Sequence, residues 1–507
     1  MKRILTILLT IVMCISTSSY AYVVSFDGGI TGDPTLDNGT YNYKEMLFIT
    51  GKPIELDGTI KVPDVPENKD SYSLKFDYEL FNNDENVSLS RSVTYDVTLD
   101  KNEEFNQTVY KAKISKLDES ITVGDRSYTL DGYLFSESLL FDNTAAVDYF
   151  SGTASGKKYY YINGDRQNNE GKVTININTD TIIGYKHHWG DSEAQIINQN
   201  INAQVNNPDY PDSSSNRYLT WDGMINLKIS NMNRKDFDYL RNDPQNISFR
   251  GNYIETVKKE RILQYDYDLP TFNDDGTFDD KDRSFDEKEL RQDMLVDSNS
   301  LITPKIRDIG GHWAEESIKM MASLQLFDSL LDFGPDLPMT RIEFAKAVSR
   351  AMAEIKESTR SDIIKRTRSN PDLLFLDIPN DYKYYDFVEF VKNKGVMIGA
   401  SEFFMPDDVI TRAEVVAIII RSLGLENLAP SAYYTIGFDD DNQIPNWARD
   451  YIYMAKEIGL LESFADNTFR PHDPVTRAEA AQLLKNFVFH IKDDITYDYR
   501  EKIINNN

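Results

Sequence analysis

The stretch DPVTRAEAAQLLKNF, residues 473–487, joins a short turn to an apolar run at helical spacing through the tetrapeptide T-R-A-E. The same pattern, T-R-x-E, precedes two more apolar runs, at residues 340–343 and 411–414. Threonine followed three residues later by glutamate is a capping box, because the hydroxyl accepts from the third helical amide and the glutamate accepts from the threonine amide. The sequence therefore predicts three helices that begin at these boxes. The predicted capping residues are Thr340, Glu343, Thr411, Glu414, Thr476 and Glu479.

The arginine in each box needs a separate explanation. A cation at the first helical position faces the positive end of the helix dipole, which costs roughly 0.3–1 kcal/mol. Unpaired amides and a guanidinium at a helix start can together hold a carboxylate or a phosphate. Two interpretations stay open: Arg341, Arg412 and Arg477 bind an anionic ligand, or each pairs with a nearby acidic side chain.

The first 21 residues have the pattern of a secretory signal peptide. Lys2 and Arg3 form a basic start, residues 4–15 are apolar, and Ala21 ends a stretch with small residues at the cleavage positions. The apolar run is short for a membrane span. Cleavage would remove Cys14, the only cysteine, and leave a mature protein without disulfides, as is common in surface proteins of Gram-positive bacteria. We expect a secreted protein of a bacterial cell wall or surface, with no membrane partner after cleavage.

The charge of the chain excludes one class of partner. It contains 55 Lys and Arg against 82 Asp and Glu, a net charge of −27. A nucleic-acid partner would need a basic face, so none is expected. An anionic polymer would have to be held by local cations at short range, because salt screens the global charge beyond about 8–10 Å.

Residues 22–265 alternate between apolar and polar side chains, as in SYSLKFDYELF at 71–81 and KVTININTD at 172–180. This period of two, interrupted by Gly, Asn and Asp turns, is typical of half-buried antiparallel strands. We expect a β-rich, sandwich-like region of one or two domains, with a barrel-like arrangement as the alternative. No motif in it identifies a catalytic nucleophile.

Residues 266–303 are acidic and poorly periodic, and we expect a solvated linker. Aligning Gly276 with the glycine of a calcium-binding EF-hand loop places Thr271 at the first ligand position, so that template fails. His187 and His188 are adjacent on a predicted strand and point to opposite faces, which makes a shared metal ion improbable. The sequence predicts no metal site and no cofactor.

After Pro304 the hydrophobic period changes to that of helices, and three repeats follow, at 304–360, 372–428 and 435–492. Each contains a first helix, a turn and a T-R-x-E helix. The first repeat combines Asp308, the tripeptide His312-Trp313-Ala314, a Phe-Gly-Pro turn at 333–335 and T-R-I-E. This combination resembles the S-layer homology (SLH) domain, which in its family occurs as three tandem copies.

The resemblance implies an all-α pseudo-trimer that binds secondary cell wall polysaccharide, commonly pyruvylated at its terminal sugar, in grooves between repeats. The arginine of T-R-x-E is a ligand in the family. The carbohydrate-binding residues carried over by position are Arg341, Arg412, Arg477, Asp308, Asp377, Asp439, Trp313, Trp447 and Gly399. Packing in a helical core is the alternative role of the two tryptophans.

The repeats are not equivalent, because the turn after the first helix contains Gly395 and Gly399 in repeat two, whereas repeat one has Gln325 at the first position. In repeat two Tyr384 and Tyr385 stand in for the tryptophan. We expect the groove with Arg412 and Gly399 to be the most active.

The sequence thus predicts a surface protein anchored non-covalently to the wall, a binding and structural protein rather than an enzyme. One alternative is an exported polysaccharide-acting enzyme that uses the repeats as its anchor. It would need a carboxylate pair about 5–10 Å apart in a cleft of the β-rich region. The other alternative is an array-forming S-layer subunit that associates with itself.

Overall fold

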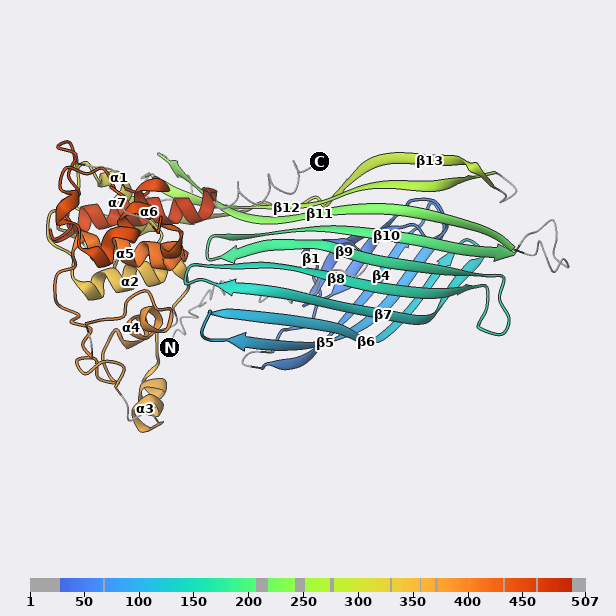
Figure 1. The fold of residues 1–507 in the computed structure, drawn as a ribbon, viewed down its shortest axis with the longest axis horizontal. Coiled ribbons are helices and arrows are strands. Elements are labelled where there is room, and N and C mark those ends of the chain that lie inside the picture. The colour runs from blue at the N-terminus through green and yellow to red at the C-terminus, as the bar shows by residue number, and fades with distance from the viewer. Residues whose placement is uncertain are drawn as a thin grey trace, which may run out of the picture.

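A computed structural model describes residues 28–494 except 67–68, 207–217, 242–250, 274–277, 329–330, 356, 370–372, 401, 432–433 and 462–463. The expected signal peptide lies outside these residues. Figure 1 shows a long sheet with the helices gathered at one of its ends. Within the described part of the chain, no helix combines the length and hydrophobicity that crossing a membrane requires.

The β-rich region forms one antiparallel sheet in which each strand from β1 to β13 pairs with the next, while β14 pairs with β12. Several strands are long; β11 has 23 residues. The strands are β1 (Ile30–Pro34), β2 (Thr40–Leu47), β3 (Ile54–Lys61), β4 (Ser71–Asn82), β5 (Val87–Asn102), β6 (Gln107–Val123), β7 (Arg126–Asn143), β8 (Val147–Ile162), β9 (Gly171–His187), β10 (Gly190–Asn206), β11 (Tyr218–Leu240), β12 (Asn252–Phe272), β13 (Phe278–Arg291) and β14 (Asp297–Leu301).

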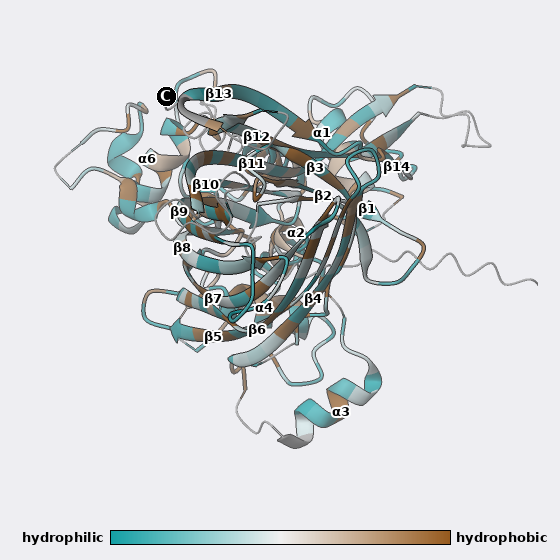
Figure 2. Cartoon of the chain, turned by 90° about the vertical axis from the view of Figure 1, so that its right-hand side faces the viewer, coloured by the Kyte–Doolittle hydropathy of each residue, from teal (hydrophilic) through white to brown (hydrophobic). Residues whose placement is uncertain are grey.

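The sheet curls until its first strand lies beside β12, where Lys259 Nζ is 3.0 Å from Asp33 Oδ1. Figure 2 shows the strands from the end of the sheet, where they curve around a common interior. The side chains that point into this interior are hydrophobic. The architecture is therefore a nearly closed, barrel-like sheet, and the expected sandwich is wrong. Period-two alternation cannot separate the two folds, because both have one buried face; the difference lies in the curvature of the sheet.

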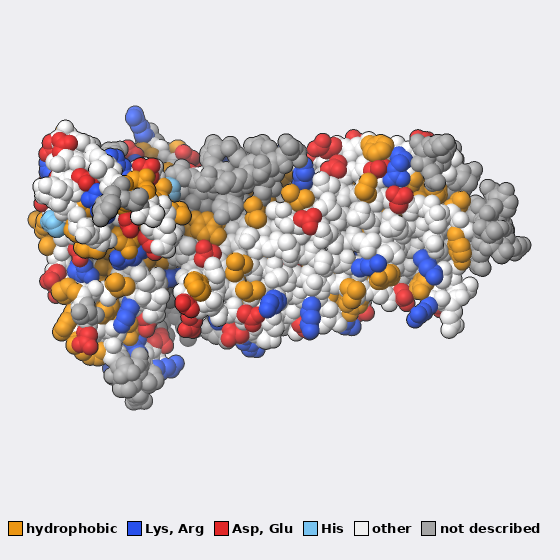
Figure 3. Space-filling view, in the orientation of Figure 1, with side chains coloured by type: hydrophobic (Ala, Val, Ile, Leu, Met, Phe, Trp, Pro, Cys, Tyr) orange, Lys and Arg blue, Asp and Glu red, His pale blue; other side chains and the backbone are white. Residues whose placement is uncertain are grey.

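The alternation itself is present as expected. In β4, Leu74, Phe76, Tyr78 and Leu80 point into the core, and the residues between them are exposed or half-buried. Figure 3 shows the outer face of the sheet with charged and apolar side chains scattered among other atoms, without one large apolar patch. Burial of this single face in one continuous hydrophobic cluster stabilises the curled sheet.

The interior also holds a buried ionic network. The Arg91 guanidinium pairs with Glu45 at 2.8 and 2.9 Å and contacts Glu119, which also accepts from Lys158 Nζ at 3.1 Å and from the hydroxyl of Tyr160. All five side chains are buried. Burial alone would raise the pKa of Glu119, but Arg91 and Lys158 lower it overall, to about 2. These residues come from four different strands, β2, β5, β6 and β8, so the network fixes how distant parts of the sheet meet.

Residues 266–303 do not form the expected linker. They complete β12 and form β13 and β14, which pair with β12 through main-chain hydrogen bonds. In the part of β13 whose side chains are described, Leu290 is buried and most of the other residues are exposed. An edge strand exposed on both faces keeps its backbone pairing without an apolar pattern, which explains why the sequence did not reveal it.

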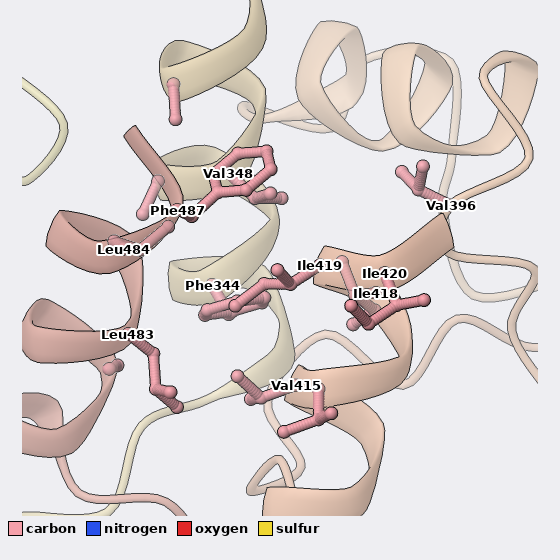
Figure 4. Close-up of a cluster of buried hydrophobic side chains, with 14 of the residues drawn as sticks. Phe344, Val348, Val396, Val415, Ile418, Ile419, Ile420, Leu483, Leu484 and Phe487 are labelled. Carbon is pink, nitrogen blue, oxygen red and sulfur yellow. The ribbon is translucent and has the colours of Figure 1, made fainter. Parts of the chain in front are cut away.

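The C-terminal region is helical, and its three T-R-x-E helices, α2, α5 and α7, meet in a common core. Figure 4 shows Phe344, Val415, Ile419 and Phe487 from these helices packed together. The helices are α1 (Glu315–Ser323), α2 (Arg341–Met352), α3 (Arg360–Ser369), α4 (Tyr385–Asn393), α5 (Arg412–Leu423), η1 (Glu426–Leu428), η2 (Asp441–Gln443), η3 (Asn446–Ala448), α6 (Arg449–Glu457), α7 (Arg477–Phe489) and η4 (His490–Asp494).

The helical region packs directly on the end of the sheet. Trp189, in the β9–β10 turn, is buried in the helical core and donates its indole N–H to Ala351 O at 2.9 Å. The amide of Ala146, in the β7–β8 turn, donates to Ser422 O at 2.8 Å. Lys492 Nζ, after α7, lies 3.2 Å from Asp236 Oδ1 of β11. The two regions therefore share a hydrophobic junction.

Candidate functional site

All three predicted capping boxes are present. In the first, Glu343 N donates to Thr340 Oγ1 at 3.4 Å and Thr340 N donates to Glu343 Oε2 at 3.0 Å. Thr411 with Glu414, and Thr476 with Glu479, repeat this arrangement at the starts of α5 and α7. Each box uses one glutamate oxygen, Oε2, and leaves the other oxygen for a further contact.

Main-chain hydrogen bonds join the residues just before the boxes into a ring. Met339 N donates to Val475 O at 2.8 Å, Val475 N donates to Ile410 O at 2.9 Å, and Ile410 N donates to Met339 O at 3.0 Å. The ring brings the three helix starts together around a pseudo-threefold axis, although they are separated by 65 residues or more in the sequence.

The three arginines form a second ring around the first, and each pairs with the glutamate of another repeat. Arg341 lies 2.7 Å from Glu414 Oε1, Arg412 lies 3.1 Å from Glu479 Oε1, and Arg477 contacts Glu343 Oε1. Each guanidinium also donates to a turn carbonyl, that of Phe404, Phe469 or Phe333 respectively. Each glutamate thus caps its own helix and pairs with an arginine of a neighbouring repeat.

The arginines differ in their exposure to solvent. The side chains of Arg341 and Arg412 are 9% and 8% exposed, whereas that of Arg477 is 21% exposed. Burial lowers the pKa of Arg412, whose guanidinium lies over the rings of Phe464 and Phe469. The groove that the sequence ranks first therefore contains a largely covered cation.

Arg477 lines a groove of about 40 Å³ between the first and third repeats. Lys346 and Arg350 of α2 add two cations to it, and both pair with Asp328, Arg350 at 3.0 Å. Burial raises the pKa of Asp328, but these two cations lower it overall. With Glu343 included, three cations face two carboxylates in the groove. The other lining residues are Leu326, Phe327, Phe333 and Met339.

The sequence patterns did not identify three residues of this groove: Lys346, Arg350 and Asp328. Lys346 and Arg350 are four residues apart on α2 and therefore share one helix face, which is a pattern that could have drawn attention to them. Asp328 gave no comparable indication, because it comes from the turn after α1 and reaches α2 only in the folded chain.

The aspartate before the first helix stabilises a turn in each repeat. Asp308 accepts from the amides of Phe333 and Gly334, and Asp377 accepts from those of Phe404 and Met405, at 2.6–2.9 Å. Gly334, Met405 and Arg470 adopt the same left-handed conformation, with φ of 65°, 57° and 58°. The aspartate therefore holds a left-handed turn in each repeat, and this turn is strained at the non-glycine residues Met405 and Arg470.

In the third repeat this role belongs to Asp440 rather than Asp439. Asp440 accepts from the amides of Phe469 and Arg470 at 2.8 and 2.7 Å, whereas Asp439 accepts from the side chain of Asn467. A buried phenylalanine two residues earlier, Phe375 in repeat two and Phe438 in repeat three, marks the correct alignment.

The aromatic positions are on the surface. Trp313 and Trp447 are 64% and 51% exposed, so neither is a core residue. Each immediately precedes the N-cap of the first helix of its repeat. The equivalent residue of repeat two is Lys383, because Tyr384 is the N-cap of α4 and Tyr385 is buried. The expected tyrosine replacement is therefore displaced by one position.

Gly399 has a structural reason to be glycine. Its φ is 70°, and a Cβ there would lie 2.6 Å from Phe403 O and 2.7 Å from the Phe375 ring. The residue permits a close approach within its own repeat. Gly399 is not among the residues that line the groove of Arg477.

Comparison with known proteins agrees with this geometry. The S-layer homology domain family matches residues 305–345, 374–416 and 437–481. An amylopullulanase of Thermoanaerobacterium thermosulfurigenes is 30% identical over 182 residues, which is 35% of this chain and 9% of that protein. A surface layer protein of Brevibacillus choshinensis is 32% identical over 81 residues, covering 16% of this chain and 7% of the relative.

A cellulosome-anchoring protein of Acetivibrio thermocellus is 26% identical over 157 residues, covering 30% of this chain and 32% of the relative. The chain thus spans less than a third of the length of each of these three proteins. Residues 305–481 are therefore three S-layer homology domains, which place the protein at the cell surface in association with the cell wall.

Proposed function

We propose that the SLH domains hold the protein on the wall by binding an anionic secondary cell wall polysaccharide, and that its pyruvyl carboxylate occupies the groove of Arg477. The observation that carries this proposal is the unequal exposure of three otherwise equivalent arginines. Arg477 is the one that lines the groove between the first and third repeats.

The chemistry of the groove suits a carboxylate. A guanidinium has five N–H donors, and the contacts of Arg477 with Phe333 O and Glu343 leave donors that a ligand can use. Lys346 and Arg350 supply further positive charge. Charge-assisted hydrogen bonds contribute about 1.5–3 kcal/mol each, so two or three of them give a modest affinity at one groove.

The carboxylates of the groove position these cations. Glu343 holds Arg477 from one side, and Asp328 holds Lys346 and Arg350 from the other. A cation whose side chain is already ordered loses less conformational entropy when a ligand binds. Leu326, Phe327 and Phe333 provide an apolar wall for the carbon face of a sugar ring.

The test is co-sedimentation of the full protein with purified wall sacculi. Arg477→Ala should weaken retention by about tenfold or more, the loss expected for one charge-assisted contact. Lys485→Ala removes one cation from the same helix outside the groove and should bind like the parent protein. Mild acid cleaves pyruvyl acetals. Sacculi that are treated with mild acid before the protein is added should therefore no longer retain it.

Equal retention of Arg477→Ala and the parent, with circular dichroism showing both folded, would contradict the proposal. Arg412→Ala adds a comparison between grooves, because the sequence favoured that arginine. A larger loss of retention for Arg412→Ala than for Arg477→Ala would assign the carboxylate to the other groove.

We further propose that the chain is a binding and structural protein rather than an enzyme. The similarity to carbohydrate-degrading enzymes is confined to the SLH region, so it transfers no activity to residues 28–301. Incubation of the protein with purified wall polysaccharide and with starch, xylan and cellulose should release no reducing sugar. Release that is lost on replacing a buried carboxylate of the sheet would overturn this part of the proposal.

A further inference from the structure

The barrel-like sheet encloses a second cavity, of about 200 Å³, near the end that carries the helical region. Residues of β1 to β4 and of β7 to β12 line it. Its position follows from β10, whose residues 191–195 lie just after the turn that places Trp189 in the helical core. None of the described residues of the SLH domains lines it, so this cavity is separate from the groove of Arg477.

Polar side chains gather on one wall of the cavity because they share the inner face of two paired strands. Asp191, Glu193 and Gln195 alternate along β10, and Asn231 and Asn233 lie opposite the first two of them on β11. Asp191 accepts from Asn233 Nδ2 at 2.9 and 3.0 Å, and Glu193 accepts from Gln195 Nε2.

Two oxygen atoms of this wall lack a hydrogen bond. Gln195 Oε1 and Asn231 Oδ1 are buried and accept from no residue in the described part of the chain. Gln195 is only 3% exposed. A buried polar atom without a partner costs about 1–3 kcal/mol, so it indicates a group that the site is built to receive.

Most of the cationic donors around the cavity are engaged. Lys259 Nζ lies 3.0 Å from Asp33 and 2.8 Å from Asp297, and Arg261 donates to two backbone carbonyls and to Asn233 Oδ1. Lys186 also lines the cavity, and its backbone lies opposite Asp191 on the neighbouring strand β9. The unpartnered atoms at the Gln195 end are amide oxygens and are therefore acceptors, and they line the same cavity as Glu193.

The opposite wall is apolar and aromatic. It contains Tyr43, Phe76, Tyr78, Leu139 and Phe150. A cavity of roughly 150 Å³ lined by apolar side chains accommodates benzene, so this cavity has room for a ring and a short polar chain.

We propose that this cavity binds a small organic ammonium compound whose apolar body lies against the aromatic wall and whose ammonium group donates to Gln195, Asn231 and Glu193. An ammonium group has three N–H donors and no acceptor, which matches a wall of acceptors. Burial raises the pKa of Glu193 and of Asp191. A bound cation favours the ionised form of a neighbouring carboxyl and would offset the cost of that burial.

The experiment is calorimetric titration of the full protein with 2-phenylethylamine, which has the required size, ring and amine. Two related probes complete the series: 2-phenylethanol, which is isosteric with the amine and keeps one donor without charge, and 3-phenylpropanoate, which is slightly larger and carries the opposite charge. The amine should bind at least tenfold more tightly than the alcohol, and the carboxylate should not bind. Binding of the alcohol or the carboxylate as tightly as the amine, or no binding of any probe, would overturn the proposal.

Gln195→Leu and Asn231→Leu should each weaken binding of the amine by about tenfold, with circular dichroism reporting the fold. Gln204→Leu is the matched control for the first, because Gln204 lies on the same strand with its side chain exposed. If Gln195→Leu fails to fold, Asn231→Leu and the probe series still decide the question. Unchanged affinity in a folded Asn231→Leu protein would exclude the assigned site. Retention of the same variants on sacculi is measured in parallel and should not change. This result would separate the cavity from the SLH groove.

Discussion

The barrel-like sheet and the SLH domains both pair arginine with glutamate, but Arg91 and Arg477 lie in different surroundings. Arg91 is buried inside the sheet between Glu45 and Glu119, and the network continues to Lys158 and Tyr160. Arg477 lies at the edge of a groove and is partly exposed, with a single glutamate partner across the repeat boundary.

The difference shows how the role of an arginine–glutamate pair depends on its burial. A fully buried pair must satisfy its hydrogen bonds inside the protein, since uncompensated burial of a charge costs several kcal/mol. A pair at a groove keeps part of its donors for a ligand. Inside the sheet the pair thus stabilises one arrangement of strands, and between the repeats it leaves donors for the ligand that we propose for the groove.

The largest expected effect comes from breaking the pair inside the sheet. Arg91→Met leaves Glu45 and Glu119 buried without their common partner and should lower the free energy of unfolding by about 3–5 kcal/mol. Urea denaturation followed by circular dichroism measures it. The combined variant Arg91→Met, Glu45→Leu and Glu119→Gln should recover part of this loss. An unchanged urea midpoint for Arg91→Met would show that the interior tolerates charge as well as the groove does.

A smaller effect is expected at the junction of the two regions, where burial lowers the pKa of His187 to about 3 and that of His188 to about 4. Because these values lie below the ordinary value of 6.5, the unfolded chain binds protons first. Stability is therefore complete above about pH 6.5 and decreases as the pH falls toward 4, by up to about 1.4 kcal/mol per pH unit for each histidine. Urea denaturation at pH 7 and pH 4.5 measures the decrease.

The matched variants identify the origin of this dependence. His188→Gln should reduce the decrease, and the same change at the exposed His472 should not. Equal pH dependence of the parent and His188→Gln proteins would mean that His188 is not a source of the acid sensitivity.

The smallest effect concerns the turn after the first helix of each repeat. Gln325, Gly395 and Gly459 all adopt a left-handed conformation, with φ of 60°, 70° and 73°. Gln325→Gly should raise the free energy of unfolding by about 0.5–1 kcal/mol, because glycine adopts this conformation without strain.

Gly395→Gln is the reverse test at the equivalent position. A Cβ at Gly395 would meet no atom within 4 Å, so only backbone strain changes, and a loss of similar size is expected. Both values come from urea denaturation at pH 7. A destabilised Gln325→Gly protein would show that the Gln325 side chain contributes more than its backbone conformation costs.

How far the sequence predicts the structure differs between the regions. The capping boxes, the SLH repeats and the alternation of the strands follow from residues within a few positions of one another, and the structure contains all of them. The exposed position of Trp313, the role of Asp440 and the strand β13 did not follow, because each depends on contacts with residues that lie far along the chain or on solvent exposure.

The sequence by itself determined where each T-R-x-E helix starts, because a capping box closes hydrogen bonds within four residues. It also determined which side of each strand is apolar. Only the tertiary structure decided that the sheet curls into a barrel-like form, that Arg477 is exposed while Arg341 and Arg412 are covered, and that Gln195 faces a cavity. The physical reason is that curvature, exposure and partner choice arise from packing between segments that are distant in sequence.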